Sequence, residues 1–222
     1  MQSPTKKLVT LAMLAALSYL TILFIRIYFM PPPVAFLTYD PKDVIIIIGG
    51  FLFGPGSAVM VALVVALAEM ITVAETGMFG ALMNFLTSAT FAGSASFIYH
   101  RFRNLGGAVA GLIAGVLLTT GVALLWNYLV VPIYTGFPRE VVAGMLVPYF
   151  LPFNLIKGGL NAAIVMLLYK PVSTALRASG LIAEKVNETE RQGFKPYVGA
   201  MVVAGFVLVS LVLVILAYQG RV

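Results

Sequence analysis

Residues 8–29 of the chain read LVTLAMLAALSYLTILFIRIYF, an apolar run whose one charged residue is Arg26. A helix that crosses the roughly 30 Å hydrocarbon core of a bilayer needs about 20 predominantly apolar residues. A signal peptide would have a shorter apolar core and a small-residue cleavage site, whereas this run is followed by Met-Pro-Pro-Pro at 30–33. The stretch therefore predicts a retained membrane-spanning helix over 8–29, which ends at the prolines because proline lacks the backbone N–H.

The composition of the whole chain agrees with this reading. Of the 222 residues, 61% are hydrophobic and 10% are charged, and the mean hydropathy is +1.02. A soluble domain is near half apolar and a quarter charged, so the composition excludes an ordinary globular protein. The absence of cysteine excludes disulfides and sulfur-liganded metals, and the one histidine, His100, leaves little imidazole chemistry.

Further apolar runs predict an all-α, polytopic helical bundle of six helices, with a possible seventh at the C-terminus. The first of them starts at Asp40, the expected N-cap, with Asp43 facing the positive end of the helix dipole. We expect a membrane core over 1–170, a cytoplasmic polar segment over 171–196 and an additional hydrophobic helix over 197–222. The runs are 44–53, 57–73, 79–99, 105–131, 147–169 and 197–218.

The basic residues orient this bundle. Cytoplasmic loops of membrane proteins carry an excess of lysine and arginine. If the N-terminus is cytoplasmic, the inner segments hold nine such residues and the outer loops hold Lys42 and Arg139. The spread of the +6 charge over loop ends therefore indicates membrane orientation, and no nucleic-acid partner is expected. The nine inner residues are Lys6, Lys7, Arg101, Arg103, Lys170, Arg177, Lys185, Arg191 and Lys195.

Lys157 is the lysine that lies deep within a predicted span. A charge at membrane depth is costly and usually faces a cavity or a partner. Asn154, Lys157 and Asn161 share one helical face, because they lie at i, i+3 and i+7. We expect this face to line a polar cavity; the alternative is a lysine that snorkels to the interface, with asparagines that bridge helices.

Other polar residues could also contact a ligand. Asn127 offers amide donors and an acceptor suited to the edge of a heterocycle, although its neighbour Trp126 also fits an aromatic interface belt. Asn84 could contact a ligand or hydrogen-bond to another helix. Glu75 could accept hydrogen bonds from ligand hydroxyls or be a solvated loop residue.

No motif supports catalysis by the chain itself. The sequence contains no G-x-x-x-x-G-K-[ST], H-E-x-x-H or G-x-S-x-G pattern. An intramembrane enzyme and a structural membrane subunit are therefore the weaker alternatives to a binding protein.

Five short segments form a further pattern along the chain. They are LTYDPKD at 37–43, GGFLFGP at 49–55, GALMNF at 80–85, WNY at 126–128 with Pro132 and Tyr134, and PFNLIKG at 152–158. Together they resemble the riboflavin-specific substrate-binding (S) components of energy-coupling factor (ECF) transporters. The similarity extends over about residues 5–170, and the C-terminal run lies beyond it.

The resemblance implies a six-helix bundle with a vitamin site near the outer face, capped by the loop that carries Leu37 and Tyr39. It implies that riboflavin is the transported ligand and that no cofactor is needed. The implied partners are a transmembrane coupling subunit, which would meet a small-residue face of the first helix at Ala12 and Ala16, and two cytoplasmic ATPases. An S component for thiamine, biotin or a folate is the main alternative.

Overall fold

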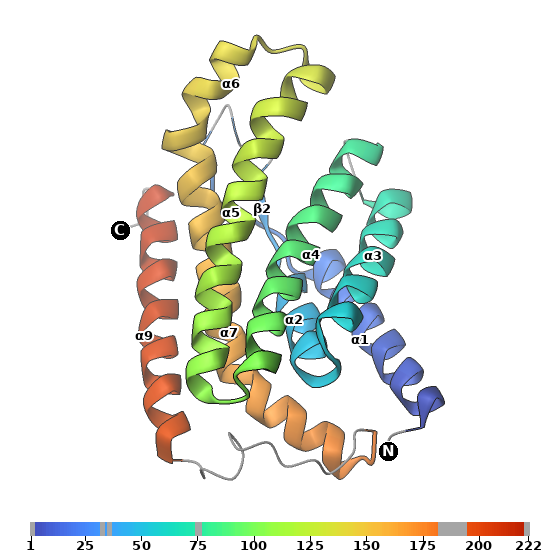
Figure 1. Cartoon of the computed structure of the whole chain (residues 1–222). Coiled ribbons are helices and arrows are strands. Elements are labelled where there is room, and N and C mark those ends of the chain that lie inside the picture. Colours follow the sequence, from blue (N-terminus) through green and yellow to red (C-terminus); the bar gives the residue numbers. More distant parts are fainter. Residues whose placement is uncertain (1–2, 32–33, 35–36, 74–76, 182–194, 220–222) are drawn as a thin grey trace.

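The computed structural model describes residues 3–31, 34, 37–73, 77–181 and 195–219, which form a bundle of helices and one short hairpin (Figure 1). The elements are α1 (Pro4–Phe24), β1 (Ile27–Tyr28), β2 (Thr38–Tyr39), α2 (Lys42–Phe53), α3 (Pro55–Thr72), α4 (Gly77–Arg101), α5 (Leu105–Thr135), α6 (Arg139–Met145), the π-helix η1 (Leu146–Phe150), α7 (Leu151–Ala178) and α9 (Lys195–Tyr218).

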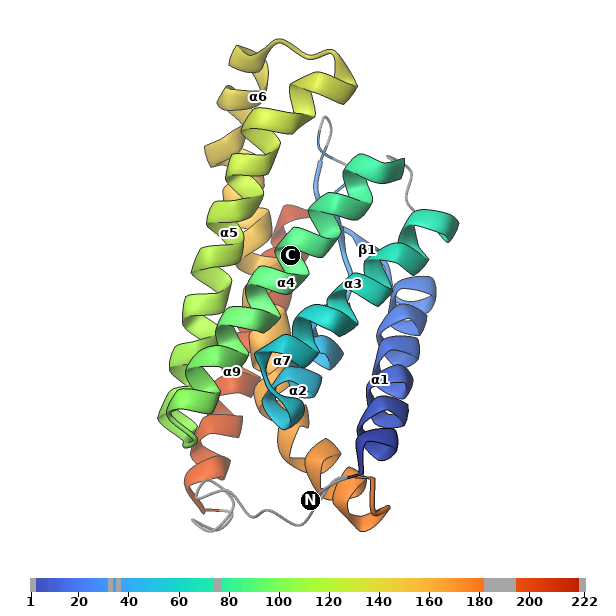
Figure 2. The same cartoon turned by 45° about the vertical axis from the view of Figure 1, so that its right-hand side comes forward.

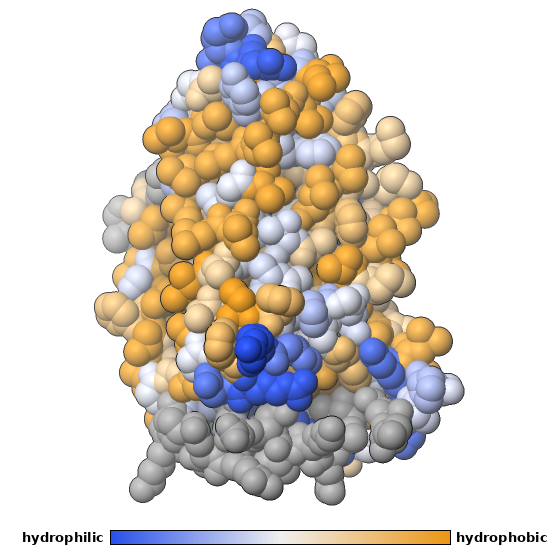
Figure 3. Space-filling view, in the orientation of Figure 1, coloured by the Kyte–Doolittle hydropathy of each residue, from blue (hydrophilic) through white to orange (hydrophobic). Residues whose placement is uncertain are grey.

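The prediction of an all-α membrane bundle is confirmed. Within the described residues, six helical segments are long and apolar enough to cross a membrane, namely Pro4–Phe24, Pro55–Thr72, Gly77–Arg101, Leu105–Thr135, Arg139–Ala178 and Tyr197–Ala217. In Figure 3, hydrophobic surface surrounds the middle of the molecule and hydrophilic surface gathers toward both ends. We call the end that carries the β1–β2 hairpin and α6 the hairpin end (Figures 1 and 2).

The first helix is shorter than the sequence predicts. It ends at Phe24, and Ile27 and Tyr28 instead pair antiparallel with Tyr39 and Thr38. The segment 25–29 consists mainly of β-branched and aromatic residues, which suit a strand when a partner strand is available. The helix therefore ends before the prolines, and the expectation that they end it is wrong.

The second helix, α2, is a short segment in the centre of the bundle. It packs against α1, α3, α4 and α7, and nine of its twelve residues are buried. It ends at Gly54, whose φ of +100° suits glycine, and Pro55 begins α3. The expectation that Asp40 is the N-cap is wrong, because Pro41 occupies that position and forms no side-chain cap.

The later helices are longer than predicted. α5 continues past Val131 to Thr135, and one helical segment runs from Arg139 through α6, η1 and α7 to Ala178. The π-helical turn includes Pro148, whose missing N–H leaves no regular backbone hydrogen bond at that point. The segment 171–178 is therefore helix, so the expected polar connection begins beyond it.

Small residues bring the central helices close together. A Cβ added to Gly111 on α5 would lie 2.6 Å from the backbone oxygen of Ala95 on α4.

The expected C-terminal helix is present as α9, which lies along α7 (Figure 1). The resulting bundle leaves a pocket at the hairpin end.

Candidate ligand-binding pocket

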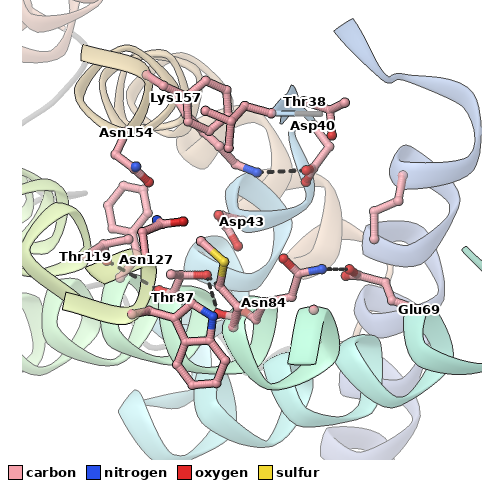
Figure 4. A pocket seen from close by; sticks show the side chains of 18 of the residues that line it. Thr38, Asp40, Asp43, Glu69, Asn84, Thr87, Thr119, Asn127, Asn154 and Lys157 are labelled. Atoms are coloured by element: carbon pink, nitrogen blue, oxygen red, sulfur yellow. Dashed lines mark hydrogen bonds and ion pairs between the residues drawn. The ribbon is translucent and has the colours of Figure 1, made fainter. Parts of the chain in front are cut away.

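A pocket of about 200 Å³ lies at the hairpin end, between the hairpin and the ends of α1, α3, α4, α5 and α7 (Figure 4). The lining carries aromatic rings, among them Phe79 and Tyr134, which stack with centroids 5.5 Å apart. Trp126, Tyr28 and Phe153 line the pocket as well. Charged residues are interspersed with these rings, namely Arg26, Asp40, Asp43, Glu69 and Lys157.

An ion pair links the hairpin side of the pocket to α7. Lys157 Nζ lies 2.8 Å from Asp40 Oδ2, and the Lys157 side chain is 20% exposed. Burial raises the pKa of the Asp40 carboxyl, but the ammonium groups of Lys157 and Lys42 outweigh it and hold the pKa below its usual range. Lys157 therefore faces the pocket as a paired cation, and the snorkelling alternative is wrong.

A second ion pair lies deeper in the bundle. Lys42 Nζ on α2 lies 2.7 Å and 3.0 Å from the two carboxylate oxygens of Glu69 on α3. Glu69 also accepts a hydrogen bond from Asn84 Nδ2 on α4, so three helices meet at one carboxylate. Both charged side chains of the pair are almost fully buried. Asn84 thus bonds between helices while it also lines the pocket.

A third carboxylate, Asp43, points toward the centre of the pocket (Figure 4). It accepts a hydrogen bond from Ser88 on α4 and a longer one, 3.5 Å, from Asn161 Nδ2 on α7. Its place in the first turn of α2 agrees with the expected dipole interaction. Asn161 Oδ1 is buried without a hydrogen-bond partner in the structure, so this region retains unused hydrogen-bonding capacity.

Two further side-chain amides, those of Asn127 and Asn154, retain hydrogen-bonding groups that a ligand can use. Asn127 Nδ2 donates to the backbone oxygen of Ala123, 2.7 Å away, and Asn154 Nδ2 donates to that of Phe150, 2.8 Å away. Each of these bonds uses one of the two N–H groups of the amide and leaves its oxygen as an acceptor. The pocket therefore combines flat aromatic surface with amides, carboxylates and an ammonium group, which suits a planar heterocycle with a hydroxylated tail.

The structure brings together most of the residues that the sequence singled out. Six of the eight predicted ligand contacts line the pocket, namely Leu37, Asn84, Trp126, Asn127, Asn154 and Lys157. Tyr39 is buried beside the pocket without lining it, and its hydroxyl has no partner in the structure. Glu75 lies outside the described residues. Ala12 and Ala16 lie on an exposed face of α1, far from the pocket.

Sequence reasoning missed several charged residues. Asp40, Asp43 and Glu69 line the pocket, yet the first two had been assigned to helix capping. Arg26 also lines the pocket, because α1 ends before it. The rule that a charge at membrane depth needs a partner could have pointed to this region, because it applies to Glu69 and Lys42 as much as to Lys157.

The fold and the pocket define a multi-pass membrane protein with a binding site at one end of its bundle. The chain belongs to the family described as "ECF transporter, substrate-specific component", whose model matches residues 6–169. The expectation from the five sequence segments is thereby confirmed.

Individual relatives carry names more specific than that of the family. The chain is 33% identical over 179 residues to the riboflavin transporter RibU of Staphylococcus aureus (strain TCH60), which covers 78% of this chain and 93% of the relative. It is 26% identical over 181 residues to RibU of Streptococcus thermophilus (strain ATCC BAA-250 / LMG 18311), covering 78% and 85%. A solved S component of a bacterial ECF transporter is similar with a TM-score of 0.66 and 32% identity, over 78% of this chain and 99% of that one.

Proposed function

We propose that this chain is the riboflavin-binding S component of an ECF-type transporter and captures the vitamin for uptake. The observation that carries the proposal is the pocket itself, which lies within the segment shared with the family and is lined by residues from the segments that resemble riboflavin-specific members. The two relatives named as riboflavin transporters support the same ligand.

The chemistry of riboflavin matches the mixed aromatic and polar lining of the pocket. The ring system is flat and apolar on its faces, and its pyrimidine edge carries both donors and acceptors. We assign this edge to the amides of Asn127 and Asn154 and to Lys157, whose ammonium group has three hydrogens and uses one on Asp40. The ribityl hydroxyls have the carboxylate and amide groups around Asp43 as partners. No cofactor is required for such binding.

The hairpin completes the pocket. Leu37 lines it, and Tyr39 belongs to the same buried apolar cluster as Leu37. The buried Tyr39 hydroxyl has no partner among the described residues and is therefore a candidate ligand contact. Asn84 and Trp126 complete the proposed contacts, together with Glu75, whose carboxylate would accept hydrogen bonds from ligand hydroxyls.

We propose that the hairpin end faces the outside and that the N-terminus is cytoplasmic. Among the described residues, the opposite end of the bundle holds the start of α1, the α4–α5 turn and the end of α7 (Figure 1), and these segments are rich in basic residues. An excess of lysine and arginine is typical of cytoplasmic segments. The basic residues concerned are Lys6, Lys7, Arg101, Arg103, Lys170 and Arg177.

The proposed partners follow from the S-component role. We propose that the chain is not itself an enzyme and that a transmembrane coupling subunit and two cytoplasmic ATPases supply the energy. Ala12 and Ala16 are exposed beside Met13 and Leu17, so this face of α1 can receive a helix of the coupling subunit. The core would comprise residues 1–170, residues 171–196 would be cytoplasmic, including the end of α7, and the region 197–222 would supply a further helix.

A titration of the purified protein with riboflavin tests the function. Binding in the aromatic pocket should quench flavin fluorescence in a saturable way, with one riboflavin per chain and no requirement for ATP. Thiamine and biotin, added in the same way, should not compete. Absence of saturable quenching, together with binding of thiamine or biotin, would overturn the assignment in favour of a different vitamin.

A further inference from the structure

The helix α9 begins at Lys195, after the family match ends at residue 169, yet it reaches the hairpin end of the bundle. Ile215, near its C-terminal end, is 8% exposed and belongs to the same apolar cluster as Phe29, Met30 and Leu37 of the hairpin region. A helix outside the shared core therefore packs into the same apolar cluster as the hairpin region, whose residue Leu37 lines the pocket.

A polar contact lies one turn further along. Gln219 Nε2 donates a hydrogen bond to the backbone oxygen of Tyr28, 3.2 Å away. Tyr28 belongs to β1 and lines the pocket. The strand contains only two residues, and an isolated two-stranded hairpin is marginally stable, so each added contact changes how often it opens.

The remainder of α9 is anchored to α7. Leu211 packs closely on Gly159, where an added Cβ would lie 2.9 Å from Leu211 Cδ1. Phe29 of the hairpin region stacks on Phe153 of α7, with ring centroids 5.5 Å apart. The hairpin region is therefore held in place by α7 and α9 jointly. The opposite face of α9 is exposed, as at Leu213, which is 50% exposed.

We propose that α9 is a brace that holds the β1–β2 hairpin over the pocket and slows the release of riboflavin, with Ile215 and Gln219 as the positioning residues. The role in release rests on the proposed function. Truncation of Ile215 leaves a cavity in the shared cluster and weakens the closed arrangement. Loss of the Gln219 side-chain amide removes the contact with β1.

The first arm of the test measures hydrogen exchange of the ligand-free, full-length protein over residues 25–31 and 37–41. Ile215→Ala and Gln219→Leu should each increase exchange in these segments. The matched control is Leu213→Ala, which removes the same number of carbon atoms from the exposed face. It should leave the exchange as in the unmodified chain.

The second arm measures the rate of riboflavin release by the recovery of flavin fluorescence after dilution. Both brace variants should release riboflavin faster, by roughly three- to tenfold in Gln219→Leu, which loses one hydrogen bond, and the control should release it at the original rate. If the unmodified chain binds no riboflavin, the proposed function fails and the exchange data still decide whether α9 holds the hairpin. Unchanged exchange and release in Gln219→Leu and in Ile215→Ala would overturn the brace. If Ile215→Ala does not fold, the exchange and release measured for Gln219→Leu alone decide whether α9 is a brace.

Discussion

Removal of Lys42 should destabilise the protein more than removal of any other lysine in the pocket region. Its ammonium group lies 2.7 Å from Glu69, and the exposed fractions of the two side chains are 4% and 3%. Breaking such a buried pair from one side leaves an uncompensated charge and costs about 3–5 kcal/mol. We expect Lys42→Met to lower the free energy of unfolding by that amount.

The double variant Lys42→Met with Glu69→Gln provides the decisive comparison. It removes both charges but keeps a side-chain oxygen that can accept the hydrogen bond from Asn84. It should recover about 2 kcal/mol relative to Lys42→Met alone, a coupling energy within the range for contacting residues. Lys157→Met is the matched control, because the Lys157–Asp40 pair is the more exposed of the two, at 20% and 9% against 4% and 3%, so breaking it should cost less.

The measurement is chemical denaturation of the ligand-free protein in mixed detergent micelles, followed by helical circular dichroism. A cost below about 1 kcal/mol for Lys42→Met would place this contact among solvent-exposed ion pairs and refute the reasoning. The same conclusion would follow if the double variant were no more stable than Lys42→Met.

Further predictions concern the ligand and the partner. Asn154→Ala and Lys157→Ala should each weaken riboflavin binding about five- to 150-fold, since the loss of a partner for a buried polar group costs about 1–3 kcal/mol. Asn127→Ala should behave similarly in the same fluorescence titration, and unchanged Kd values would show that these side chains do not contact the ligand. Ala12→Trp or Ala16→Trp should keep the riboflavin Kd but lose co-purification with the coupling subunit and ATP-dependent uptake, because the larger ring prevents close helix packing. Tryptophan variants that assemble and transport normally would show that this face of α1 meets lipid only.

The helices could be predicted because length and hydropathy are properties of neighbouring residues. The predicted run 105–131 corresponds to α5, Leu105–Thr135, and the run 57–73 corresponds to α3, Pro55–Thr72. The end of α1 could not be predicted in this way. Apart from Arg26, residues 25–29 continue the apolar run of the helix before them, and pairing with Thr38 and Tyr39 selects a strand.

The polar face of α7 was predicted for the same local reason. Asn154, Lys157 and Asn161 lie on one side of a single helix, and helical spacing alone reveals that arrangement. The ion pairs depend on contacts between distant segments. Lys157 and its partner Asp40 are 117 residues apart, and Lys42 and Glu69 are 27 residues apart. The sequence alone therefore places Lys42 in an outer loop, whereas in the structure Lys42 is a buried residue of the short helix α2.

These ion pairs also bear on how substitutions in the pocket should be interpreted. Asp40 joins the start of α2 to α7, and Glu69 joins α3 to both α2 and α4, so the groups that face the pocket also connect its walls. A change at Lys157 can weaken riboflavin binding by removing a ligand contact or by releasing the hairpin side of the pocket. The hydrogen bond of Asn154, in contrast, goes to the Phe150 carbonyl within one continuous helical segment. A loss of affinity in Asn154→Ala with an unchanged free energy of unfolding therefore reports ligand contact directly, whereas Lys157→Ala requires both measurements before its effect can be assigned.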